Sequence, residues 1–174
     1  MMALVATAAP AQQQGPIHHT QRLDLTLGRH TTSGGFIDYR TGVLFDLLGA
    51  SEVRSESLWN WVVGIGAGLV GGGFGDRCLI SPRGGCAPQG NFFAGNLLSG
   101  VDVPLGRASA RALIGPAVYA GAGATSLGLQ GRADVTSPPL AHCGLGLMLR
   151  ITVLPSHAAD RLVAWAMGGS VTLR

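Results

Sequence analysis

The chain has 174 residues, which suits one domain, and only 12% of them are charged, whereas an ordinary soluble domain carries roughly 25%. The 28 glycines argue against a helical protein, because each glycine inside a helix costs about 1 kcal/mol relative to alanine. The net charge of +3 comes from scattered arginines, and without a basic cluster we expect no nucleic-acid partner.

The N-terminus resembles an export signal. Residues 1–8 are apolar, and Ala9-Pro10-Ala11 has the small-x-small pattern of a signal-peptidase site. No positively charged region precedes it, which a start site further upstream would explain. We therefore predict a signal peptide over residues 1–11, a tail over 12–20 and one domain over 21–174. The alternative interpretation of residues 1–11 is a disordered apolar tail.

Strands fit the apolar segments better than helices do. Residues 58–75 and 112–131 carry no charge and approach the roughly 20 residues that a spanning helix needs. However, the first contains seven glycines, and Gly115-Pro116 interrupts the second. From Trp59 to Leu69, large apolar residues alternate with small or polar ones, which is the period of a lipid-facing strand.

The same alternation recurs along the chain in segments of about ten residues, the length with which a tilted strand crosses a bilayer. It predicts strands over residues 21–31, 39–49, 59–69, 92–103, 110–120, 127–135, 142–153 and 162–173. Polar or proline-rich turns separate them, including residues 31–35, 51–57, 104–109 and 137–139. We predict an all-β fold: a closed up-and-down antiparallel transmembrane barrel of about eight strands, because closure pairs every backbone group inside lipid.

The predicted inner face carries four acids and four bases. They are Asp24, Arg40, Asp46, Asp102, Arg111, Arg132, Asp134 and Arg150. An unpaired buried charge costs several kcal/mol, and eight strands enclose only enough space for side chains. We therefore predict an ion-paired, side-chain-filled lumen. The alternative is a narrow gated conduit or proton path.

The three cysteines fit an exported protein. Cys78 and Cys86 lie in a loop rich in glycine and proline, and their spacing suits a disulfide in an oxidising compartment. Cys143 is predicted to stay free within an apolar alternating run. The histidines lack metal-ligand spacing, and no serine lies in a nucleophile elbow. We expect no catalytic residue, no metal and no cofactor, and hence no enzyme.

The chain resembles the small bacterial outer-membrane β-barrel domain proteins of uncharacterised function. The resemblance rests on these segments: Ala9-Pro10-Ala11-Gln12, Leu25-Thr26-Leu27-Gly28, the Cys78/Cys86 loop, residues 113–119 and residues 130–134. It implies a barrel in the outer membrane, with the lipid bilayer and the outer-membrane assembly machinery as partners, and it implies no activity. Such barrels often end in an aromatic residue, whereas this chain ends in Thr172-Leu173-Arg174.

Two functions remain open from the sequence. The first is a structural or surface-interaction barrel that presents the Cys78–Cys86 loop to an unknown surface ligand, because binding residues often lie in loops on a rigid scaffold. The second is a barrel that binds or transports lipid or another apolar ligand, either lipocalin-like or a narrow conduit. A soluble carrier would point its apolar face inward. The aromatic residues Phe45, Trp59, Trp61, Phe93 and Trp165 resemble the girdles of a barrel with lipid outside.

Overall fold

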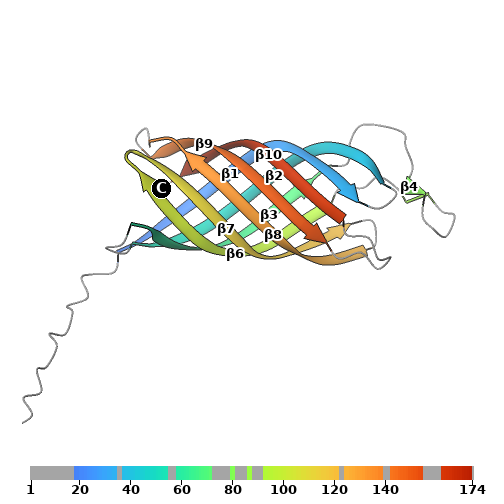
Figure 1. Ribbon diagram of the computed structural model, residues 1–174, viewed down its shortest axis with the longest axis horizontal. Coiled ribbons are helices and arrows are strands. Elements are labelled where there is room, and N and C mark those ends of the chain that lie inside the picture. The colour runs from blue at the N-terminus through green and yellow to red at the C-terminus, as the bar shows by residue number, and fades with distance from the viewer. Residues whose placement is uncertain are drawn as a thin grey trace, which may run out of the picture.

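The computed structural model describes residues 18–34, 37–54, 58–71, 79–80, 86–87, 92–121, 124–138, 142–154 and 162–173. Within them, eight long strands form a closed antiparallel barrel in the order β1-β10-β9-β8-β7-β6-β3-β2 (Figure 1). The predicted fold class is therefore confirmed. None of the described residues forms a helix long and apolar enough to span a membrane.

The eight barrel strands correspond, in chain order, to the eight strands predicted from the sequence. The barrel strands are β1 His18–Gly34, β2 Ile37–Arg54, β3 Asn60–Val70, β6 Phe92–Leu105, β7 Ala108–Gly121, β8 Ala124–Thr136, β9 Cys143–Leu154 and β10 Leu162–Leu173. Two short strands, β4 Leu79–Ile80 and β5 Cys86–Ala87, pair with each other in a separate sheet.

The two ends of the barrel differ. The terminal end holds the start of β1, the end of β10 and the tight turn at Gly106 and Arg107. Gly106 has a φ of 65°, a conformation that glycine adopts without strain and that allows β6 and β7 to join through two residues. The loop end holds the connection from β3 to β6, and β4 lies beyond the barrel there (Figure 1).

The strands are tilted around the barrel axis. Starting at Trp61 of β3, the row of directly paired residues passes once around the wall and arrives at Gly71, ten residues further along the chain. This offset is the shear of the barrel, and together with the strand number it fixes the tilt and the diameter. It also decides which side chains meet across the lumen.

The first two strands are longer than the sequence predicted. β1 begins at His18, where we expected a tail, and β2 continues to Arg54 through residues expected to form a turn. The ladder between them runs from the pair His18 and Arg54 onward. Backbone pairing stabilises both segments although their side chains are polar, and polar composition alone had indicated a turn.

The side chains separate into two faces. Large apolar residues are exposed on the outside, with Leu147 at 72% and Ile65 at 71%. Charged and polar residues lie inside together with two apolar clusters, one containing Leu44 and Tyr119 and the other Leu48 and Val62. Where the structure describes the side chains, the predicted inward and outward faces of the strands are those observed.

Candidate functional site: the charged lumen

Ion pairs cross the lumen from one wall to the other. Arg111 on β7 binds Asp24 on β1, and these two strands lie on opposite sides of the barrel. Arg111 also binds Asp134 on the neighbouring strand β8, with 3.1 Å between nitrogen and oxygen. All three side chains are about 1% exposed. Charges taken this far from water are stabilised only by well-placed partners.

A second crossing lies at Asp46 of β2. One of its carboxylate oxygens accepts from Arg132 on β8, the opposite strand, at 2.6 Å, and the other accepts from Arg150 on β9 at 3.2 Å. Arg132 also contacts Asp134 at 2.9 Å. Gly68 leaves room for this arrangement, because a Cβ there would lie 2.8 Å from Asp46 Oδ1.

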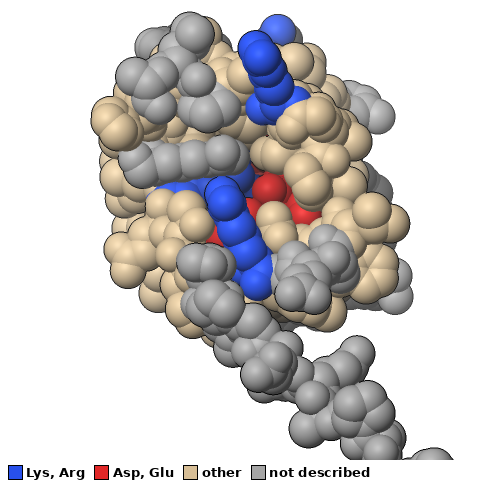
Figure 2. Space-filling model, turned by 90° about the vertical axis from the view of Figure 1, so that its left-hand side faces the viewer, with Lys and Arg blue, Asp and Glu red and all other residues tan. Residues whose placement is uncertain are grey.

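A third group surrounds Arg22 of β1 near the terminal end. Its guanidinium contacts Asp24 at 3.2 Å and Asp102 of β6 at 3.9 Å, and it donates to the Thr136 hydroxyl at 2.9 Å. The Thr172 hydroxyl donates to Asp24 at 2.6 Å. Seen from the terminal end, acidic side chains lie deep in the mouth with arginines around them (Figure 2).

The structure brings most of the predicted lumen residues into one connected set. The links run Asp24–Arg111–Asp134–Arg132–Asp46–Arg150, and Arg22 connects Asp24 to Asp102. We call these eight residues the lumen network. The side chain of Arg40 lies outside the described residues; its backbone pairs with Thr32.

The sequence reasoning missed two buried charges. Arg22 is 4% exposed and lies two residues before Asp24, so the alternation that placed Asp24 inside should also have placed Arg22 there. Glu52 is 4% exposed as well, and it was missed because it falls in the expected turn of residues 51–57. Glu52 accepts a hydrogen bond from Asn60 at 2.8 Å. Arg22 and Glu52 add one base and one acid to the inner face, so the predicted equality of acids and bases there does not change.

Of the three candidate cysteines, the structure describes the side chain of Cys143 alone. Cys143 is a free, exposed thiol on the outer face of β9. Cys78 and the side chain of Cys86 lie outside the described residues, so their disulfide stays a prediction, and so does the signal peptide of residues 1–11. Within the described part of the chain, no three His, Cys, Asp or Glu residues are arranged to hold a metal ion.

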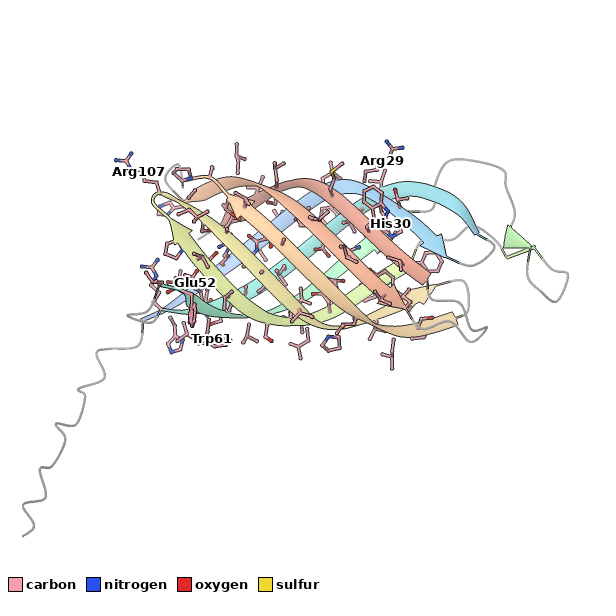
Figure 3. The ribbon with its side chains drawn as sticks, viewed as in Figure 1. Arg29, His30, Glu52, Trp61 and Arg107 are labelled. Atoms are coloured by element: carbon pink, nitrogen blue, oxygen red, sulfur yellow. The ribbon has the colours of Figure 1, made fainter. Side chains whose placement is uncertain are left out.

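The outer wall is an apolar belt between aromatic residues. Trp59 and Trp61 are exposed at the terminal end, while Phe93 and Trp165 are exposed toward the loop end. Among the described residues between the two ends, Arg29 is the single charged side chain exposed on this wall, and it points outward near the loop end (Figure 3). A transmembrane barrel has this arrangement of girdles and belt.

An apolar outer wall around a charge-filled, closed eight-stranded lumen defines the class of small transmembrane β-barrels. No family model matches the chain, and no curated protein is significantly similar to it. Neisserial surface protein A has a similar structure, with a TM-score of 0.55 and 12% identity over 90% of this chain and 98% of the other.

A second similar structure is Ail, the attachment invasion locus protein of Yersinia pestis. Its TM-score is 0.51, at 13% identity over 88% of this chain and 97% of the other. The protein thus has the fold of the small bacterial outer-membrane β-barrels. At these identities the likeness extends to the fold.

Proposed function

We propose that the protein is an outer-membrane barrel with a closed lumen and a structural or surface-interaction role. The observation that carries this proposal is the pairing of charges across the lumen: Asp24 with Arg111, and Asp46 with Arg132. Linked opposite walls make a rigid cylinder. Such a cylinder is suited to hold connecting segments at a membrane surface.

The outer wall supports the membrane location. Large apolar side chains are exposed along every barrel strand, for example Leu27 at 65% and Leu127 at 66%. Contiguous apolar surface on this scale is rare in soluble monomers, because they rarely expose patches above a few hundred Å². A lipocalin-like carrier would turn such residues toward its lumen, which here holds arginine and aspartate. The outward direction of the apolar side chains and the inward direction of the charged ones therefore favour the membrane barrel over the soluble carrier.

The packing of the lumen supports a closed barrel over a conduit. Arg150, Gln130 and Met148 are among the largest fully buried side chains, and they lie inside together with the lumen network. An aqueous pore requires a wider barrel, as in porins with 16–18 strands. The interaction role then falls to the connections at the loop end.

The connection from β3 to β6 is the strongest candidate for a surface-binding segment. It includes the paired strands β4 and β5, and Cys86 lies in β5. Binding residues concentrate in loops on rigid scaffolds. We propose that this segment, closed by a Cys78–Cys86 disulfide, meets an unknown surface ligand.

Fractionation and conductance test this function together. Membranes from cells expressing the full chain are washed with carbonate and with high salt, and the purified protein is inserted into planar bilayers. We expect the protein to stay in the membrane and to give no stable single-channel conductance. Release by carbonate would refute the membrane location, and discrete ion channels would refute the closed lumen. Proteolysis of intact cells should cut first within residues 72–91, and protection of that segment would refute its surface role.

A further inference from the structure

The ladder between β6 and β7 is interrupted in the middle of the wall. Pairing runs from Phe93 and Ala120 to Asn96 and Ala117, and it resumes in the same register at Ser99 and Ile114. The two pairs in between, Leu97 with Pro116 and Leu98 with Gly115, are missing. On the other side of β7, the ladder with β8 continues without a break across Pro116.

Proline causes this interruption. Both missing pairs require a hydrogen bond from the backbone N–H of residue 116 to the Leu97 carbonyl, and proline has no N–H. The Leu97 carbonyl oxygen is therefore left without its ladder donor. Inside a bilayer no bulk water replaces such a donor, and proline is accordingly rare in central strands.

On the lumen side of the same seam, one polar side chain, Gln130, lies among the buried apolar residues Leu98 and Ala117. Gly115 has no side chain, and a Cβ built there would collide with the Leu97 carbonyl oxygen, so no side chain of residue 115 covers that oxygen from within. Gln130, the partner of Gly115 on β8, is 0% exposed. Neither its amide nitrogen nor its amide oxygen has a hydrogen-bond partner among the described residues.

A second unpartnered carboxamide, that of Asn96, lies outside the seam. It is 7% exposed and has no hydrogen-bond partner among the described residues for either amide atom, but it lies over Gly66 of β3, on the side of β6 away from β7. The hydroxyl next to Gln130, that of Thr152, is bonded to the Tyr119 hydroxyl at 3.0 Å. The seam thus brings together one carbonyl, that of Leu97, and one carboxamide, that of Gln130, on either side of Gly115.

We propose that this seam is a water-binding site, formed by the Leu97 carbonyl and the Gln130 carboxamide. Buried polar groups in proteins are almost always paired, either with protein groups or with ordered water. A carboxamide offers two donors and an acceptor, and a buried water molecule makes two to four hydrogen bonds to such groups. The site makes the β6–β7 seam the hydrated, most easily opened part of the middle of the wall, where the other described ladders run without a gap.

Amide exchange and water contacts test the site in the full chain, refolded and isotope-labelled in detergent micelles or lipid nanodiscs. The N–H groups of Gly95, Leu97 and Ser99 all point toward β7. The Leu97 N–H itself still donates to the Pro116 carbonyl, as the pair of Asn96 with Ala117 requires, but the neighbouring bond to the Leu97 carbonyl is missing. We expect the Leu97 amide to exchange about tenfold faster than the other two, because opening the seam there breaks roughly one hydrogen bond fewer. We also expect magnetisation transfer from water to the side-chain amide of Gln130. Equal protection of the three amides, or no water transfer to the Gln130 carboxamide, would overturn the proposal.

Two proline variants provide the matched comparison. Pro116→Ala restores the missing donor and should slow Leu97 exchange to the rate of Gly95. Pro104→Ala replaces an exposed proline at the end of β6, where the pair with Ser109 is intact, and should leave Leu97 unchanged. Fast Leu97 exchange in folded Pro116→Ala would also overturn the proposal. If that variant does not fold, the wild-type comparison of Gly95, Leu97 and Ser99 decides.

Discussion

Arg132 and Arg150 lie directly opposite each other on β8 and β9, and both side chains point into the lumen. Like charges at paired positions destabilise a sheet. Asp46 resolves the conflict from the far wall, with one carboxylate oxygen on each guanidinium. Removing this single acid should therefore disturb two strands at once.

Asp46→Asn tests that arrangement. The variant keeps the shape of the side chain but leaves two buried arginines facing each other, and breaking a buried pair costs about 3–5 kcal/mol of unfolding free energy. Urea unfolding in micelles measures the loss, and Leu47→Ile on the outer face serves as the control. A change below about 1 kcal/mol would show that neither arginine depends on Asp46.

Substitutions at neighbouring positions of β9 should have very different effects on stability, because the two side chains point to opposite faces of the wall. Arg150→Leu removes a lumen charge and strands part of Asp46, with a cost of about 3–5 kcal/mol, whereas Leu149→Ile on the lipid face should be nearly silent. Leu149→Arg should cost about 2–4 kcal/mol if the position lies near the bilayer midplane. Heat-modifiable gel mobility reports all three. If Arg150→Leu folds normally while Leu149→Ile unfolds, the assignment of the inner and outer faces of β9 is wrong.

The three cysteines should divide into a pair and a free thiol. We expect Cys78 and Cys86 to be bonded and Cys143 to react with a membrane-permeant thiol reagent. A short disulfide loop stabilises by roughly 2–3 kcal/mol in the chain-entropy model, so reduction should loosen residues 79–85 and leave the barrel folded. Non-reducing peptide mapping checks the pairing, and a disulfide that includes Cys143 would contradict it.

The mature protein should begin near Gln12. The pattern Ala9-Pro10-Ala11 fits a signal-peptidase site, and cleavage there leaves β1, which starts at His18, intact. The intact mass of protein recovered from membranes measures the N-terminus directly. A membrane form that retains Met1 would refute the prediction.

The sequence predicted the fold better than the site because the two depend on different information. A period of two assigns each strand residue to one face, which is why Leu149 was placed outside and Arg150 inside. Strand ends at the rim carry polar side chains on both faces, so the paired segment through Glu52 was mistaken for a turn. The partners across the lumen were not predictable: Asp24 and Arg111 are 87 residues apart in sequence, and only the shear of the closed barrel brings them together.

The pairs across the lumen have a consequence for how the chain enters a membrane. Asp24 on the first strand is matched by Arg111 on β7 and by Thr172 on the last strand, so its partners arrive only when the cylinder closes. A sheet that entered lipid strand by strand would carry bare carboxylates and guanidiniums against hydrocarbon, each at a cost of several kcal/mol. Insertion and closure must therefore take place together. The hairpins cross the bilayer as a group, and the charges pair with one another as β1 and β10 form the last ladder.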